Sequence, residues 1–196
     1  WSPDSKKLLW SDKMLRLQYV DVDSKQVSVV ATSKDWEYTD FSWSPDSRWI
    51  VYGRSDDDFR NKVFLYDTQS KQSTLVSDHW YEAYGGVFSP DGKYLYFVSD
   101  RDFSPTYSRT EWNHSYADMS KVYLVTLAKS TPSPLAPKND EVQVKVDTAS
   151  TAATKPEDTK KKGGKEKADE SKEKPAAPST PATVIDLDGI QERSVA

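Results

Sequence analysis

The sequence predicts an all-β fold built from repeated antiparallel units, and three observations support this prediction. A ten-residue motif occurs three times, as WSPDSKKLLW from Trp1, WSPDSRWIVY from Trp43 and FSPDGKYLYF from Phe88. The three copies start 42 and then 45 residues apart, a period typical of a repeat architecture. All tryptophan, tyrosine and phenylalanine residues lie before residue 124, so this part of the chain can bury an apolar core.

Each copy of the motif predicts a β-hairpin. Its Ser-Pro-Asp core, followed by Ser or Gly, is typical of a turn, because proline presets φ and small polar residues suit the neighbouring positions. Aromatic and β-branched residues then follow the turn, as expected for a strand. The segments after the three turns are 8–10, 49–52 and 94–97.

Two further strands follow each hairpin. The third strand of each unit is expected at 15–22, 62–68 and 121–127, and the fourth at the segments VSVVA, STLVS and PSPLA. Four antiparallel strands in about 40–50 residues are the signature of a β-propeller blade. A β-sandwich is the alternative, but it does not call for the same hairpin at a near-constant period. We therefore expect a β-propeller fragment of about three four-stranded blades in residues 1–137, the first lacking its inner strand. Closed propellers need about four to eight blades, so the chain is expected to be part of a longer protein.

The connections between strands differ in length. The hairpin turns are short, whereas SDK, RSDDDFRN and SDRDFSPTYSRTEWNHSYADMS join the second and third strands of successive units. All long connections are expected on one face, where binding residues of a rigid scaffold usually lie. The predicted peptide contacts on this face are Trp36, Trp80, Tyr81, Arg101, Tyr107 and Trp112. The alternative is that these side chains pack on one another.

The sequence shows no catalytic constellation. His79 and His114 are the two histidines, and no nucleophile elbow accompanies them. The SDDDF segment lacks the spacing of a calcium loop, and the chain has no cysteine. We therefore predict no catalytic, metal or cofactor site in this chain.

The charge distribution bears on partners and on the later part of the chain. The net charge is −4 without a basic stripe, and no apolar run is long enough for a membrane span, so we expect neither nucleic acid nor membrane as a partner. Residues 138–182 are mostly Lys, Glu, Asp, Ala, Pro, Thr and Ser, which predicts a disordered insertion. A basic arm is the alternative, although its charge is nearly balanced. Residues 183–196 regain a strand pattern and are expected to return to the propeller.

The third long connection also carries a resemblance to a known family. The run YLYFVSDRDFSPTYSRTEWNHSYADMSKVYLVTL, followed by TPSPLAPKNDE and then IDLDGIQER, resembles tricorn protease homologues in the same order. The resemblance covers nearly the whole chain apart from residues 138–182. The blade motif alone is less specific, since it also occurs in the Tol-system periplasmic propeller and in dipeptidyl peptidases.

The resemblance implies a function that composition and spacing do not show. It implies a segment of the second propeller of a tricorn-like serine peptidase, with the catalytic residues in a core outside this chain. The propeller would guide or filter oligopeptides, beside other domains of the same polypeptide and in a homo-oligomer. A cytoplasmic location follows, with the periplasm as the alternative. The alternative function is a non-enzymatic protein-interaction propeller of the Tol-system type.

Overall fold

The computed structural model describes residues 1–55, 58–107, 114–116, 118–137 and 182–196. The described residues up to 136 and from 182 onward belong to one compact unit. The predicted disordered insertion lies outside the described residues, except for Ala182 at its end. All strand pairs in the described part of the chain are antiparallel, and its one helix is the short 3₁₀ helix η1 (Ile190–Arg193).

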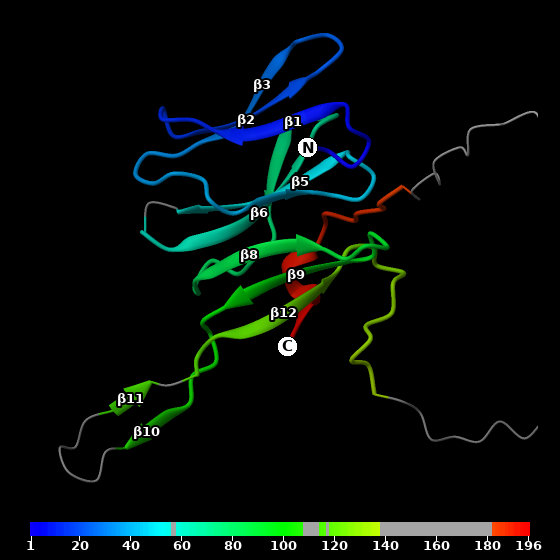
Figure 1. Ribbon diagram of the computed structural model, residues 1–196. Coiled ribbons are helices and arrows are strands. Elements are labelled where there is room, and N and C mark those ends of the chain that lie inside the picture. The colour runs from blue at the N-terminus through cyan, green and yellow to red at the C-terminus, as the bar shows by residue number, and fades with distance from the viewer. Residues whose placement is uncertain (56–57, 108–113, 117, 138–181) are drawn as a thin grey trace, which may run out of the picture. The chain divides into compact units, whose positions relative to one another are not determined.

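The strands form three successive sheets and a separate hairpin (Figure 1). The first blade contains β1 (Lys7–Ser11), β2 (Arg16–Asp21) and β3 (Val27–Thr32). The second contains β4 (Phe41–Trp43), β5 (Trp49–Ser55), β6 (Asn61–Asp67) and β7 (Gln72–Leu75). The third contains β8 (Ala83–Phe88), β9 (Tyr94–Ser99), β12 (Lys121–Thr126) and β13 (Ser194–Val195). Strands β10 (Pro105–Tyr107) and β11 (His114–Tyr116) pair with each other in the connection from β9 to β12. The prediction of an all-β propeller fragment is confirmed.

The repeated motif forms the same hydrogen-bonded turn in each blade. In the second blade, the Ser44 hydroxyl accepts the backbone N–H of Trp49 at 2.8 Å and donates to the Asp46 carboxylate. Ser47, the residue after Asp46, has a φ of 62°, in the left-handed region. Gly92 has a φ of 68° at the equivalent position of the third blade, where glycine takes this conformation without strain. The motif recurs because each copy closes a hairpin through its own side chains.

The second blade is buried on both of its faces. Alternate residues of β5 and β6 point to opposite sides of the sheet, so Ile50 and Tyr52 pack against the first blade while Val51 and Val63 pack against the third. These four side chains are completely shielded from solvent. A strand between two blades therefore consists of continuous apolar residues rather than an alternating pattern. The core of the chain lies between the sheets.

The fourth strand of the third blade corrects the sequence prediction. The segment PSPLA forms no strand, and β13 pairs with β12 instead, through Leu124 with Val195 and Val125 with Ser194. Proline has no N–H to donate to a β-ladder, so the two prolines of PSPLA limit the hydrogen bonds that this segment could make with β12. Residues 183–187 form no strand, although the expectation was a strand over 183–190.

The position of β13 also corrects the expected distribution of loops. The connection from β12 to β13 leaves the third blade beside its hairpin turn, because Thr126 pairs with Tyr94 directly after that turn. This connection is the longest in the blade, yet it starts on the face where only short turns were expected. Long connections therefore occur at both ends of the third blade.

Candidate functional site

The connections from β1 to β2, β3 to β4, β5 to β6, β7 to β8 and β9 to β12 lie at one end of the sheets, which we call the loop face. Their described residues are 12–15, 33–40, 58–60, 76–82, 100–107, 114–116 and 118–120. The opposite end, called the turn face, carries the three repeated hairpin turns. The loop face contains the candidate binding site of this chain.

A cavity of about 780 Å³ opens on the loop face between the first and second blades. The side chains of Trp36 and Phe59 are 66% and 74% exposed and supply its aromatic surface. A smaller cavity of about 80 Å³ adjoins it and is lined by the buried Tyr38. We call the two cavities together the loop-face pocket; its larger cavity is lined by Leu15, Asp35, Trp36, Glu37, Thr39, Ser55, Phe59 and Asn61.

Local contacts hold the segment that presents Trp36. The Ser33 hydroxyl accepts the backbone N–H groups of Asp35 and Trp36, and the N–H of Gly53 donates to the Asp40 carbonyl at 2.9 Å. Between these anchors, Tyr38 turns inward and packs edge to face against Tyr52, with ring centroids 5.9 Å apart. Trp36 is consequently held at the surface by a segment that is fixed on both sides.

Phe59 is presented by an unusual backbone conformation. Its φ is 59°, in the left-handed region that bulky side chains rarely adopt. The neighbouring Asp58 accepts the N–H of Arg60 at 3.2 Å and forms an ion pair with Lys62 at 3.1 Å. Strained residues of this kind occur preferentially at binding and catalytic sites.

Tyr38, which lines the smaller cavity, carries a buried hydroxyl group. Burial raises the pKa of Tyr38 well above its usual range, so the phenol stays protonated at neutral pH. Its oxygen has no hydrogen-bond partner among the residues that the structure describes. The Arg54 guanidinium, which also lines this cavity, stacks over the Phe64 ring at 4.3 Å. The Tyr38 hydroxyl is therefore a buried polar group without a partner among the described residues.

The predicted peptide contacts have different positions in the structure. Trp36 lines the loop-face pocket, whereas Trp80 and Tyr81 lie on the connection from β7 to β8, 76% and 44% exposed. Tyr107 is exposed on β10, and Trp112 lies outside the described residues. Of these predicted residues, Trp36 is the one that the structure places in the pocket.

Arg101 has contacts within its own blade. Its guanidinium carbon lies 3.6 Å from the ring centroid of Tyr123 and 6.0 Å from that of Phe97. Its Nη2 also donates to the Ser194 hydroxyl at 3.2 Å. Arg101 thus joins β13 to the rest of the sheet.

Asp35, Glu37 and Phe59 line the pocket but are not among the peptide contacts predicted from the sequence. Phe59 is the aromatic residue of the SDDDF segment, which was expected to be part of a long connection without calcium-loop spacing. A signal was present, because this segment and the one around Trp36 both connect strands at the loop face. An aromatic residue on each of two neighbouring connections would have indicated a shared site.

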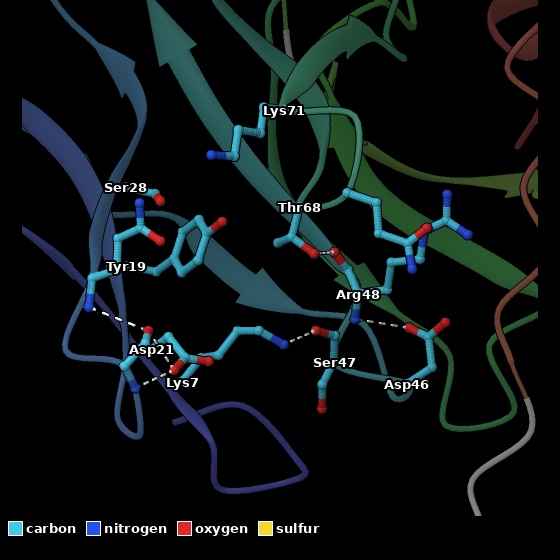
Figure 2. Close-up of a pocket in the computed structure, with 12 residues that line it drawn as sticks. Lys7, Tyr19, Asp21, Ser28, Asp46, Ser47, Arg48, Thr68 and Lys71 are labelled. Atoms are coloured by element: carbon cyan, nitrogen blue, oxygen red, sulfur yellow. Dashed lines mark hydrogen bonds between the residues drawn. The ribbon is translucent and has the colours of Figure 1, made fainter.

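A second cleft, of about 610 Å³, opens on the turn face between the same two blades (Figure 2). Its polar groups mostly satisfy one another. The Lys7 ammonium donates to the Ser47 carbonyl at 3.1 Å, and the Thr68 hydroxyl donates to the Arg48 carbonyl at 2.7 Å. Asp21 accepts from the backbone and the hydroxyl of Ser24, which lowers the pKa of its carboxyl group. This cleft is a consequence of the repeated turns, so we assign it no ligand.

The described ranges of the chain contain no cluster of three or more His, Cys, Asp or Glu side chains able to hold a metal ion. No helix in them is long and apolar enough to cross a membrane. His79 is exposed on the connection from β7 to β8.

The three antiparallel sheets, packed face to face around shared cores, define the chain as part of a β-propeller. Comparison with known proteins specifies the family. Residues 1–196 match the family described as the Tricorn protease second beta propeller domain. The chain belongs to this family.

Curated relatives and a solved structure agree with this assignment. The chain is 29% identical over 126 residues to the tricorn protease homolog of Saccharolobus solfataricus, covering 64% of this chain and 12% of that protein. It is 28% identical over 137 residues to tricorn protease homolog 1 of Streptomyces coelicolor, covering 70% of this chain and 13% of that protein. The crystal structure of the tricorn protease matches the fold with a TM-score of 0.68 and 20% identity, over 99% of this chain and 16% of that chain. The chain thus spans a small part of the proteins that it matches.

Proposed function

We propose that this chain is an accessory propeller segment of a tricorn-type serine peptidase, in which it guides or filters oligopeptides on their way to a catalytic core outside this chain. Membership of the tricorn second-propeller family supports the peptidase context. The observation that supports peptide handling is the loop-face pocket, where Trp36 and Phe59 expose aromatic rings beside a cavity of about 780 Å³. The family match over residues 1–196 favours this proposal over a non-enzymatic interaction propeller of the Tol-system type.

The geometry of the pocket suits an extended peptide. Aromatic rings offer large apolar contact surfaces to side chains of many kinds, which matches a surface that handles varied sequences. The lining also includes hydroxyl groups, from Thr39 and Ser55, that can bond to a peptide backbone. Asn61 donates its amide N–H to Glu82 at 3.0 Å, and its amide oxygen, which has no partner among the described residues, can accept from a peptide N–H. The rigid double-sided core of the second blade holds these groups in place.

The third blade supports packing against other parts of the same polypeptide. One face of this blade carries four side chains that are 37–62% exposed: Tyr84, Val87, Tyr96 and Val122. They are neighbours across β8, β9 and β12 on the face turned away from the second blade. We propose that a further blade of the same propeller covers them. A homo-oligomeric, cytoplasmic peptidase is the assembly that we propose for the complete protein.

Peptide turnover by the complete polypeptide tests the proposed guiding role. We compare kcat/KM for a decapeptide with kcat/KM for a dipeptidyl coumarin amide, which is small enough to reach the core without guidance. Trp36→Ala and Phe59→Ala together should lower the value for the decapeptide by about tenfold, the equivalent of ~1.4 kcal/mol of lost contact. The value for the short amide should stay the same, because the core is untouched.

Val29→Ala is the control, since Val29 is a half-exposed residue of β3 outside the pocket. It should affect neither substrate. If kcat/KM for the decapeptide were the same in the double variant and in the parent protein, the loop-face pocket would have no part in peptide handling. An equal fall for both substrates would also contradict the proposal, because it would show a general effect on the enzyme.

A further inference from the structure

We propose that the loop-face pocket selects peptides that carry a lysine or arginine side chain. This inference rests on the proposed function, because it specifies which oligopeptides the pocket takes. Three observations on the described residues support it: two carboxylates without a described partner, a described lining without a basic residue, and two exposed aromatic rings.

The two carboxylates flank Trp36 in the sequence and line the larger cavity with it. Asp35 and Glu37 are both exposed, and neither side chain has a hydrogen bond or ion pair within the described residues. Other acidic groups nearby are already engaged. Asp12 binds Arg16 at 2.6 Å, and Asp58 binds Lys62 at 3.1 Å. Asp35 and Glu37 are consequently free to attract a cation.

The described lining of the larger cavity contains no basic residue. Two basic side chains near it have other partners. Arg54 stacks on Phe64 in the smaller cavity, and Arg60 donates to the Trp80 carbonyl at 3.1 Å. Lys34 is engaged in an interaction of its own, and Lys13 lies on a neighbouring connection without lining the cavity. The larger cavity thus presents two negative charges with no positive charge among its lining residues.

The aromatic rings add a second attraction for the same ligand group. A cation over the face of a tryptophan or phenylalanine ring is stabilised by about 0.5–1 kcal/mol at exposed sites. The aliphatic stem of lysine or arginine can lie along Trp36 or Phe59 while its charged end meets a carboxylate. A glutamine side chain would keep part of the apolar contact without the charge, and a glutamate would be repelled. The pocket should therefore distinguish peptides by the charge at one position.

Peptide binding to the complete polypeptide provides the test. The probes are fluorescein-labelled octapeptides Gly-Ala-Ala-X-Leu-Ala-Ala-Gly, with lysine, arginine, glutamine or glutamate at X. Binding is measured by fluorescence anisotropy at 4 °C, and mass spectrometry checks that the peptides stay intact. The lysine and arginine peptides should bind about five- to tenfold more tightly than the glutamine peptide. This preference should shrink in high salt, which screens exposed charges.

Charge-neutral variants connect the preference to the two carboxylates. In the double variant Asp35→Asn, Glu37→Gln, the dissociation constants of the lysine and glutamine peptides should lie within about twofold of each other. Asp23→Asn is the matched control, because Asp23 is an exposed carboxylate on the turn face. It should leave the preference unchanged. Equal binding of the lysine and glutamine peptides by the parent protein, or a preference that persists in the double variant, would overturn the inference.

Trp36→Ala separates this inference from the proposed function. If this variant weakens all four peptides while the parent protein shows no charge preference, the pocket handles peptides but does not select cations. If the variant binds every peptide as the parent protein does, the pocket has no part in peptide binding and both proposals fail.

Discussion

Arg48 holds Asp67 through two hydrogen bonds, from Nε to Oδ1 at 3.0 Å and from Nη2 to Oδ2 at 2.8 Å. The pair connects the turn before β5 to the end of β6, and the guanidinium also stacks over the Trp49 ring at 4.9 Å. A bidentate hydrogen-bonded pair of arginine and carboxylate is among the strongest polar contacts in proteins. The two hydrogen bonds from Arg48 lower the pKa of Asp67 from 3.8 to about 2.

The lowered pKa predicts a pH-dependent contribution to stability. The stabilisation that ionised Asp67 contributes is fully present above the unfolded-state pKa and is lost as the pH falls from about 4 towards 2. Asp67→Asn should therefore lower the free energy of unfolding by roughly 2 kcal/mol at pH 7 and by much less near pH 2. Urea denaturation of the complete propeller at several pH values measures this difference. Asp23→Asn is the control, and a cost for Asp67→Asn that did not vary with pH would contradict the prediction.

The interface between the second and third blades predicts an effect at Gly86. A Cβ atom at this position would lie 2.5 Å from Cγ2 of Val51 and 3.2 Å from Cγ1 of Val63. Gly86→Ala should destabilise the propeller by about 1–3 kcal/mol, because the two sheets would have to move apart. Adding Val51→Ala removes the closest clash, so the double variant should lose less stability than the sum of the two single variants. Simple additivity would show that Gly86 does not limit the approach of the blades.

The buried Trp49 and the exposed Trp80 are predicted to contribute very differently to stability. Trp49 is 4% exposed in the core, and Trp80 is 76% exposed on the loop face. Trp49→Ala should cost about 3–5 kcal/mol of unfolding free energy, whereas Trp80→Ala should change it by no more than about 0.5 kcal/mol. Denaturant titration followed by circular dichroism distinguishes them. A large loss for Trp80→Ala would show that its ring packs against part of the complete protein.

The contacts of Arg101 predict a local effect on β13. Lysine at this position keeps the charge but loses the planar group that lies over Tyr123 and donates to Ser194. Arg101→Lys should therefore increase hydrogen exchange at Ser194–Val195 by about tenfold, while exchange in β5 and β6 stays unchanged. Unaltered exchange in β13 would mean that the two-residue strand is held mainly by its pairing with β12.

The hairpins could be predicted from the sequence because their determinants are local. Within each motif, the serine bonds to the strand residue five positions later, and the aspartate accepts from that same serine. The contacts that form each turn thus lie inside the ten residues that identify it. The period of the motif then indicated the number of blades, and the tricorn family followed from longer runs around the third copy.

The fourth strand of the third blade could not be predicted in the same way. PSPLA occupied the expected place in the sequence, whereas β13 lies more than sixty residues beyond the end of β12. Loop closure becomes only slowly more costly with loop length, so the chain can take a distant segment with free N–H groups in preference to a nearby one with prolines. Sequence order gives little information about such a choice.

By itself, then, the sequence determined the local elements of this protein: the turn chemistry, the apolar strands and the all-β repeat that they compose. The tertiary structure decided which of these elements meet. It placed Trp36 and Phe59, from neighbouring blades, in one pocket with Asp35 and Glu37, and it gave Arg101 its partners in Tyr123 and Ser194. The physical reason is that a turn is formed by hydrogen bonds within a few residues, whereas a pocket between blades forms only when two separately folded sheets pack against each other.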